Sequence, residues 1–447
     1  MPEYTHLFPK NKKIGFVGLG ISNLPVALML KERGYYVTLR DKRVTEPVEG
    51  FNCIFGENYL KNIYEDILFL APAVRHDIAE IAEAQKRGVY VTTEINEFFK
   101  RKKGKVIAVT GSDGKTTTTT LIYEILKKSG VKTLLGGNIG LNLLVNLEQE
   151  DKNTVTVCEL SSFQLMKAHY APDIAVITNI APNHLDWHTG MDEYINAKKN
   201  IYRLMKNGLC VLNADDAVSM NFINEIPVET ITVSGTKVLN NGVYFDNEAI
   251  YYDKAKIINC SDILLPGRHN RYNYCQAIAA AYGYTTKYII EKVAKTFPGV
   301  KYRGQFIREV DGVKYFNSSI DSSPTRTAAA LRAFNQRVIV IAGGYDKKIP
   351  LDPLGPLFEE KAKQVILMGN TGTKIKEILE KLPYSGIVTA AASMEEAVTT
   401  AYKAAKPGDI VILSPAAASY DMYKNFEERG DRFADCVGGL KEDGKSI

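Results

Sequence analysis

Short apolar runs rich in β-branched residues alternate along the chain with segments whose apolar residues recur at helical spacing. Three of these runs pass directly into a glycine turn, at residues 14–20, 106–111 and 338–344. A strand that ends in such a turn is typical of the opening of a parallel α/β unit, where ligands bind beyond the carboxyl ends of the strands. The pattern therefore predicts three nucleotide-binding-like α/β domains in series.

The other segments complete this α/β pattern. Residues 227–262 are an exception, because alternating residues and turn sequences such as Asn240-Asn-Gly242 predict a small antiparallel sheet. We expect an N-terminal Rossmann-like domain (1–99), a central P-loop-type ATPase domain with a mainly parallel sheet (100–301) and a C-terminal Rossmann-like domain (302–447). Further strands are expected at residues 35–39, 67–70, 133–140, 154–159, 175–179, 365–369 and 409–414, and helices at 191–202 and 277–282.

Composition limits the classes of function. A chain of 447 residues is too long for one core, and its net charge of +5 is mild. The densest basic cluster, residues 100–105, is interpreted as a solvated linker between two domains rather than a nucleic-acid patch. The six cysteines form no CxxC pair, residues 1–13 contain no apolar core of a secretory signal, and no apolar run is as long as a membrane span. We expect a cytoplasmic protein with reduced thiols, without membrane insertion or a nucleic-acid partner.

A candidate phosphate site lies at Gly111-Ser-Asp-Gly-Lys-Thr116, between a predicted strand and a helical pattern. Backbone N–H groups and the helix N-terminus can face the anion there, lysine can reach the outer phosphates, and threonine can bind Mg²⁺. The turn is two residues shorter than the usual P-loop, and alone it is compatible with a kinase, an ATPase or a GTPase. The expected phosphate contacts are Gly111, Ser112, Asp113, Gly114, Lys115, Thr116 and Thr117.

Residues at the ends of other predicted strands suit the same site. Glu159 ends a strand in a carboxylate, where a further Mg²⁺ contact belongs beside a P-loop. Asn138 lies in the loop after another strand. His184 alone is more often structural, but its place at a strand end beside the phosphate site favours a function. Lys198 alone is an ordinary surface lysine.

Two further signals leave alternatives open. The turn Gly18-Leu-Gly-Ile-Ser-Asn23 has asparagine where a dinucleotide-binding turn has glycine, and Asp41 follows where a ribose-binding acid is expected. An NAD-type site, another nucleotide-like ligand and a purely structural role all fit. The amides of Asn270 and Asn273, at the start of an alanine-rich helix, suit either adenine recognition or helix capping.

The shortened turn resembles that of the Mur ligase superfamily, which includes folylpolyglutamate synthases. The resemblance covers essentially the whole chain. Residues 414–430 are similar to the branch that adds D-glutamate to UDP-N-acetylmuramoyl-L-alanine in peptidoglycan precursor synthesis. Other matching stretches are Gly137-Asn-Ile-Gly140, Glu159-Leu-Ser-Ser-Phe-Gln164, Asn183-His-Leu-Asp186, Ala197-Lys198 and Gly267-Arg-His-Asn-Arg-Tyr-Asn273.

The resemblance implies a reaction and a set of site residues. ATP phosphorylates the substrate carboxylate, and the amino group of D-glutamate displaces phosphate from the acyl phosphate to form an amide. Such chemistry needs positioning and charge neutralisation rather than a protein nucleophile. By the resemblance, the catalytic residues are Lys115, Asn138, His184 and Lys198, with Asn138 near the transferred phosphate. The implied Mg²⁺ ligands are Thr116, Glu159, His184 and Lys198, the last as a carbamate. The residues implied to face ATP are Asn270, Asn273, Arg303 and Ser318, those implied to face the uridine nucleotide are Ser22, Asp41 and Arg43, and those implied to face D-glutamate are Ser322, Lys347, Ser419 and the backbone of Phe426.

Several positions depart from the family pattern. Ala71-Pro-Ala73 replaces Ser-Pro-Gly, which would strain Ala73 by about 1 kcal/mol if its φ were positive. In the third domain, Tyr302 and Gln305 replace histidine and glutamate, Ser318 replaces an aspartate expected to meet ATP, and Asp321 adds an acid. A diverged ligase for another amino acid, or a catalytically weakened nucleotide-binding protein, therefore stays an alternative.

The family resemblance also bears on movement and assembly. It implies that the protein is a monomer. Three domains joined by short linkers, with substrates held between them, are expected to close during the reaction.

Overall fold

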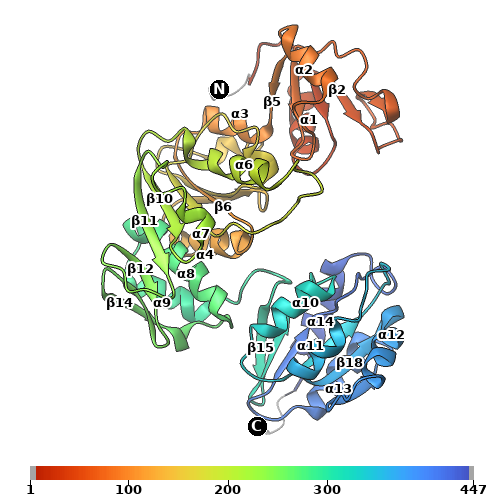
Figure 1. Ribbon diagram of the computed structural model, residues 1–447. Coiled ribbons are helices and arrows are strands. Elements are labelled where there is room, and N and C mark those ends of the chain that lie inside the picture. Colours follow the sequence, from red (N-terminus) through yellow and green to blue (C-terminus); the bar gives the residue numbers. More distant parts are fainter. Residues whose placement is uncertain (1–6, 442–447) are drawn as a thin grey trace. The chain divides into compact units, whose positions relative to one another are not determined.

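The computed structural model describes residues 7–441. By their internal contacts the residues form two compact units. One comprises Met1–Ile258 and Tyr272–Val293, and the other comprises Asn259–Arg271 and Ala294–Ile447. Three β-sheets with flanking helices make up these units (Figure 1). The α/β fold class predicted from the sequence is confirmed.

The first sheet, called the N-terminal sheet, has five parallel strands in the order β3-β2-β1-β4-β5. Successive residues of its central strand point to opposite faces, so Phe16 packs in one core cluster with α1 and Val17 in another with α2. Its elements are β1 (Lys13–Val17), α1 (Asn23–Glu32), β2 (Tyr36–Asp41), β3 (Asn52–Phe55), η1 (Gly56–Asn58), β4 (Ile67–Leu70), α2 (Ala79–Lys86), β5 (Tyr90–Thr92) and α3 (Glu94–Arg101).

The second sheet, called the central sheet, has nine strands in the order β14-β13-β12-β11-β10-β9-β6-β8-β7. Strand β6 lies between β8 and β9 and is parallel to both, so the loops after these three strands emerge at one edge. The elements of this region are β6 (Lys105–Thr110), α4 (Lys115–Lys128), β7 (Thr133–Gly137), η2 (Leu147–Gln149), β8 (Val155–Glu159), α5 (Ser162–Leu165), β9 (Ile174–Ile177), α6 (Met191–Arg203), β10 (Leu209–Asn213), α7 (Ala217–Met220), β11 (Glu229–Ser234), β12 (Gly242–Phe245), β13 (Ala249–Tyr252), β14 (Ala255–Asn259), η3 (Cys260–Asp262), α8 (Arg268–Ala281), η4 (Tyr282–Tyr284) and α9 (Lys287–Thr296).

Residues 227–262 contain the expected antiparallel pairing, between β12 and β13. They do not form a sheet of their own, however, because β11 pairs in parallel with β10 and joins them to the central sheet. The alternation along these strands predicted their conformation but carried no information about the neighbour they would join.

The third sheet, called the C-terminal sheet, has six strands in the order β15-β16-β20-β17-β18-β19. Both faces are covered, since Val340 packs with α10, α11 and α12 whereas Ile341 packs with α13 and α14. Its elements are β15 (Gln305–Val310), β16 (Val313–Asn317), α10 (Pro324–Arg332), β17 (Val338–Gly343), α11 (Leu354–Lys361), β18 (Ala362–Met368), α12 (Gly369–Glu380), β19 (Ile387–Ala390), α13 (Met394–Ala404), β20 (Ile410–Leu413) and α14 (Phe426–Gly438).

The structure also bears on the basic cluster, the cysteines and the search for a membrane-spanning helix. The basic cluster at 100–105 is less of a linker than expected, because Arg101 ends α3 and Lys105 begins β6, which leaves Lys102–Gly104 between them. All six cysteines are free thiols in the structure. Among residues 7–441, no helix combines the length and the apolar character needed to cross a membrane.

Candidate active site

The glycine turn predicted to hold phosphate joins β6 to α4. Gly111 has a φ of 144°, and a Cβ there would lie 1.8 Å from the hydroxyl oxygen of Thr178. Gly114 has a φ of 77°, and a Cβ would lie 2.4 Å from the amide oxygen of Asn273. Both positions therefore need glycine for its backbone freedom and for its lack of a side chain. The predicted strand, turn and helix are confirmed.

Residues of the loop that follows β9 hold this turn in place. Thr178 donates to the carbonyl oxygen of Asp113 at 2.6 Å, and the N–H of Asp113 donates to the side chain of Asn179 at 3.0 Å. The hydroxyl of Ser112 donates to the carbonyl oxygen of Ala181 at 2.7 Å. The side chain of Ser112 therefore serves to shape the turn, and Thr117 lies buried in the first turn of α4.

Three of the predicted site residues meet beside the turn. Thr116 donates from Oγ1 to Oε2 of Glu159 at 2.7 Å, and Asn138 donates from Nδ2 to Oε1 of the same carboxylate at 2.8 Å. Glu159 is only 2% exposed. A hydroxyl, a carboxylate and an amide from α4 and from the ends of β8 and β7 thus converge at the edge where parallel strands place ligands.

Lys198 is a buried residue and not the surface lysine that its sequence position alone suggested. Its side chain is 1% exposed, and Nζ donates to the carbonyl oxygen of Gly111 at 2.7 Å. Burial, reinforced by the charge of Lys115, lowers the pKa of Lys198 to about 6. The lowered pKa favours the neutral form of the amine, in which the nitrogen keeps a free electron pair.

His184 stands in the loop after β9 with a φ of 54°, which is uncommon for a residue with a side chain. Its ring lies 4.9 Å from the ring of Phe163, measured between centroids. Partial desolvation, together with the charge of Lys115, lowers the pKa of His184. The imidazole is therefore kept neutral and able to act as a ligand or an acceptor.

The donor set fits Mg²⁺ in part. Glu159 and Thr116 offer hard oxygen donors, which Mg²⁺ prefers, and this ion usually keeps several waters and substrate phosphate oxygens among its ligands. Among the residues that the structure describes, no group of three or more His, Cys, Asp and Glu side chains is gathered to hold a metal.

The two asparagines expected near adenine have different surroundings. Asn273 is buried, and its amide oxygen accepts a hydrogen bond from Thr118 of α4 at 3.3 Å. It therefore packs beneath the glycine turn. Asn270 donates from Nδ2 to the carbonyl oxygen of Pro266 at 2.7 Å, at the start of α8.

The predicted uridine-nucleotide residues surround the first turn of the N-terminal sheet. Asp41, at the end of β2, accepts hydrogen bonds from the backbone N–H groups of Leu19 and Arg43, both at 2.7 Å. Burial opposes ionisation of Asp41, but these backbone donors outweigh it and lower its pKa. Ser22 precedes α1, and the side chain of Arg43 is exposed. A cleft with an empty volume of about 240 Å³ is lined by Ser22, Leu70, Pro72, Thr93, Glu94, Ile95, Phe163 and Gln164.

The predicted D-glutamate residues lie around the carboxyl edge of the C-terminal sheet. Lys347 donates from Nζ to the hydroxyl of Ser322 at 3.4 Å, which places these two residues together. The backbone carbonyl of Phe426 accepts from the hydroxyl of Ser319 at 2.8 Å. Ser419 is buried after β20, and Arg303 is exposed before β15.

The altered residues of this unit are integrated into its packing. Asp321 is 5% exposed, and it accepts hydrogen bonds from Ser414, at 2.9 Å, and from Ser318. Tyr302 has a φ of 63°, and its N–H donates to the side-chain oxygen of Gln305 at 3.1 Å. The altered side chains thus satisfy one another within the unit.

Comparisons with known proteins give the chain its family. Residues 109–281 match the Mur ligase middle domain, and residues 302–417 match the domain described as Mur ligase, glutamate ligase domain. A UDP-N-acetylmuramoylalanine–D-glutamate ligase of Acetivibrio thermocellus is 44% identical over 453 residues, which cover 97% of each chain. A ligase of the same name from Clostridium beijerinckii is 44% identical over 97% of this chain and 98% of its own. The chain belongs to the Mur ligase family.

Solved structures agree with this membership at the level of fold. The UDP-N-acetylmuramate-alanine ligase MurC of Thermotoga maritima has a TM-score of 0.61 at 20% identity and covers 96% of this chain and all of its own. The UDP-N-acetylmuramoyl-L-alanyl-D-glutamate–2,6-diaminopimelate ligase has a TM-score of 0.60 at 19% identity and covers 84% of this chain and 87% of its own. As a Mur ligase, the protein is an ATP-dependent ligase that forms a carbon–nitrogen bond.

One departure from the Mur ligase pattern, Ala73, does not introduce the backbone strain that a positive φ would cause. Ala73 is not among the described non-glycine residues with positive φ, so the strain considered for that position does not arise.

Sequence reasoning missed a group of polar residues beside the site. Arg75, His188 and Glu193 form a chain of hydrogen bonds with Ser162, which directly precedes Phe163. The signal available in the sequence was the second histidine, four residues after His184, in a loop whose quoted motif ended at Asp186.

Proposed function

We propose that this Mur ligase joins D-glutamate to UDP-N-acetylmuramoyl-L-alanine, with ATP converted to ADP and phosphate. The observation that carries the proposal is the 44% identity, over 97% of the chain, to proteins named for this reaction. The structure supplies compatible chemistry at the glycine turn, where Thr116, Glu159 and Asn138 converge.

The first step transfers the γ-phosphoryl group of ATP to the carboxylate of the L-alanyl group. Backbone N–H groups of the turn and the ammonium of Lys115 neutralise phosphate charge, because this transfer depends on positioning and electrostatics. Asn138, which contacts Glu159, is proposed to face the substrate near the transferred phosphate. Asn270, Asn273, Arg303 and Ser318 are proposed to contact the rest of ATP.

Thr116, Glu159, His184 and Lys198 are proposed to hold Mg²⁺, which when bound would neutralise the charge that develops between the two anionic reactants. The amine of Lys198 is a cation when protonated and therefore a poor ligand. Its lowered pKa and its burial favour reaction with CO₂ to form a carbamate, which would turn this residue into an anionic ligand.

In the second step the amine of D-glutamate attacks the acyl phosphate, and the tetrahedral intermediate collapses to an amide and phosphate. Lys347, Ser322, Ser419 and the backbone at Phe426 are proposed to hold the dicarboxylate, for which a cation and hydroxyl groups are suitable partners. Ser22, Asp41 and Arg43 are proposed to bind the uridine nucleotide.

A phosphate-release assay tests the proposal. The protein is supplied with ATP, Mg²⁺ and UDP-N-acetylmuramoyl-L-alanine, and D-glutamate is compared with L-glutamate and other D- and L-amino acids. Release with D-glutamate alone is expected. Release only with another amino acid would identify a ligase with a different acceptor, and no release under any condition would contradict the proposal.

Three further properties belong to the same proposal. The domains are taken to span residues 1–99, 100–301 and 302–447. The enzyme is proposed to act as a monomer in the cytoplasm, where ATP is available, with neither nucleic acid nor membrane as a partner. Sedimentation of the purified protein at several concentrations is expected to show the mass of one chain throughout, and a larger mass would contradict the monomer.

A further inference from the structure

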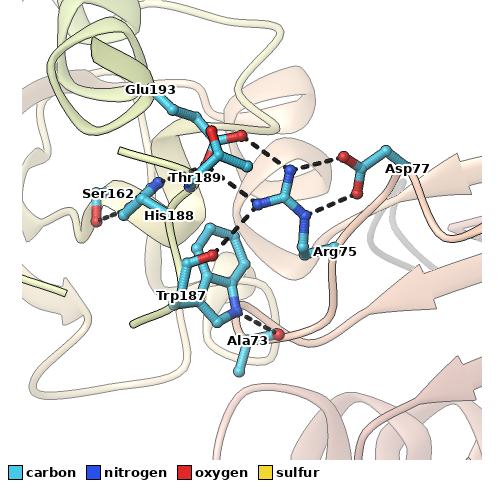
Figure 2. A network of polar contacts seen from close by, with 8 residues as sticks. All are labelled: Ala73, Arg75, Asp77, Ser162, Trp187, His188, Thr189 and Glu193. Carbon is cyan, nitrogen blue, oxygen red and sulfur yellow. Dashed lines mark hydrogen bonds and ion pairs between the residues drawn. The ribbon is translucent and has the colours of Figure 1, made fainter. Parts of the chain in front are cut away.

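The loop that follows β4 is held by donors from loops beside the central sheet. Lys167 donates to the carbonyl oxygens of Ala71, at 3.0 Å, and Pro72, at 2.9 Å. The indole N–H of Trp187 donates to the carbonyl oxygen of Ala73 at 2.9 Å (Figure 2). Three consecutive carbonyl groups of this loop are therefore fixed by side chains from two loops beside the central sheet, in the same unit.

Arg75, two residues further along, ties the loop more firmly. Its guanidinium donates to both carboxylate oxygens of Glu193, at 2.8 and 3.1 Å, and to both oxygens of Asp77 (Figure 2). It also lies 5.1 Å from the centre of the Trp187 ring, within the range of a cation–π contact. Bidentate pairing of a guanidinium with a carboxylate fixes the orientation of the two groups as well as their distance.

His188 continues the chain of contacts beyond Glu193. Its Nδ1 lies 3.1 Å from the Glu193 carboxylate, and its Nε2 lies 2.9 Å from the hydroxyl of Ser162. A carboxylate can only accept, so Nδ1 carries the proton and Nε2 accepts from Ser162. The buried ring is therefore fixed at both nitrogens.

The contacts end at the candidate active site. Ser162 and Phe163 lie in α5, which follows the strand that ends in Glu159. The ring of Phe163 packs against the rings of His184, at 4.9 Å, and Trp187, at 4.5 Å. Pro72 and Phe163 also line the same cleft, together with Ser22. An unbroken series of contacts thus joins the loop to His184.

We propose that Arg75, Trp187, His188 and Glu193 form a coupled seam that positions the loop 71–73 for the nucleotide-sugar substrate. They act as positioning residues, since they hold the loop and α5 in register while other groups contact the reactants. The proposal rests on the proposed function for the identity of the substrate. A seam that merely attached two domains would not favour one substrate. The proposed seam should affect the binding of the nucleotide-sugar substrate selectively, and its residues should act together.

A double-variant cycle tests this idea. Arg75→Gln and His188→Gln are each expected to raise the KM for UDP-N-acetylmuramoyl-L-alanine about tenfold and to leave the KM for ATP within threefold. In the double variant, the factor by which this KM rises is expected to be at least threefold smaller than the product of the two single factors. Glu193→Gln, which keeps the side-chain volume, is expected to resemble the single variants and covers the case in which Arg75→Gln fails to fold.

The matched control is Arg33 and Glu148, an ion pair at 2.8 Å that also joins α1 of the N-terminal sheet to the central region. Arg33→Gln and Glu148→Gln are expected to leave the KM for UDP-N-acetylmuramoyl-L-alanine within twofold. Two results would overturn the proposal: equal changes of this KM in the seam and control variants, or a double variant whose change equals the product of the single changes. Either would show that the seam only attaches the loop and has no selective effect on this substrate.

A second readout is independent of turnover. Trp187 is the single tryptophan of the chain, so its emission reports directly on the seam. Binding of UDP-N-acetylmuramoyl-L-alanine is expected to change this emission in the wild type and the control variants, with a dissociation constant raised about tenfold in the seam variants. If the wild type binds this compound but releases no phosphate with D-glutamate, the proposed function fails while the seam is still judged by these constants. If the wild type does not bind it, the seam proposal fails as well.

Discussion

Lys115 ends the glycine turn with its ammonium folded back onto the turn, where Nζ donates to the carbonyl oxygen of Ser112 at 2.9 Å. When phosphate enters the turn, this charge is available for it. Lys115→Ala is expected to reduce phosphate release at least about 100-fold, the usual effect of removing one such stabilising donor. Lys127→Ala, at an exposed position of the same helix, should be close to wild type. Near-normal turnover of Lys115→Ala would remove the basis for the phosphate assignment.

Lys198 and Lys199 are consecutive residues with opposite surroundings. Lys198 is buried beside the turn, whereas Lys199 pairs with Glu225 at 2.7 Å. Lys198→Ala is expected to lose most activity and to regain part of it when acetate or bicarbonate is added, because a small anion can occupy the place of the carbamate. Lys199→Ala serves as the control and should keep its activity. Wild-type activity in Lys198→Ala would contradict a role in metal binding.

Asp321 links protonation to stability. Burial raises the pKa of its carboxyl group to about 6, against the hydrogen bonds of Ser318 and Ser414. Because the pKa in the folded state lies above the unfolded value of about 3.9, the folded state binds more protons between these values, so stability is lost as pH rises through them.

Replacing Asp321 should remove this dependence. Asp321→Asn is expected to gain stability relative to the wild type as pH rises from 4 to 7, by up to about 3 kcal/mol. Urea denaturation followed by circular dichroism measures the difference, with Asp352→Asn, at an exposed position of the same unit, as the control. A constant difference across this range would show that Asp321 ionises normally.

At the scale of elements, helix α4 offers a comparison between two glycines at its ends. Gly114 and Gly130 have nearly equal φ values, 77° and 79°, but only Gly114 lacks space for a Cβ, which would meet Asn273 at 2.4 Å. Gly130→Ala is expected to lose about 1 kcal/mol of stability because of its positive φ, and Gly114→Ala at least as much, because its Cβ must also displace Asn273. Only Gly114→Ala is expected to weaken ATP binding, by at least about tenfold, as measured by calorimetry. Equal binding in the two variants would show that the turn tolerates a side chain.

Predictability also differs between elements. The strand, turn and helix around Gly111 could be predicted because apolar periodicity, glycine placement and Lys115 all lie within one short stretch of chain. The helical pattern around Lys198, in contrast, does not indicate that this lysine is buried. The pairing of Arg75 with Glu193 joins residues 118 positions apart, and each is an ordinary charged residue in the sequence. Such contacts are a property of the tertiary structure, and a local pattern contains no signal for them.

At the scale of the whole molecule, the proposed reaction needs both compact units. The glycine turn and Glu159 belong to the unit that comprises Met1–Ile258 and Tyr272–Val293, whereas Lys347 and Ser322 belong to the other. Reacting atoms must come within about 3–3.5 Å of one another, so the amine of D-glutamate and the acyl phosphate can react only when both units hold their substrates together. Closure of the units during the reaction stays a prediction.

Small-angle scattering can detect this closure. The radius of gyration of the wild type is expected to fall when UDP-N-acetylmuramoyl-L-alanine and a non-hydrolysable ATP analogue are added together, because bound ligands favour the closed arrangement by their greater affinity for it. Gly114→Ala, which is expected to bind the ATP analogue weakly, should show a smaller fall at the same concentrations. An unchanged radius in the wild type at saturating ligand would mean that the units already hold their reactive arrangement before the substrates bind, and that closure does not limit entry to the site.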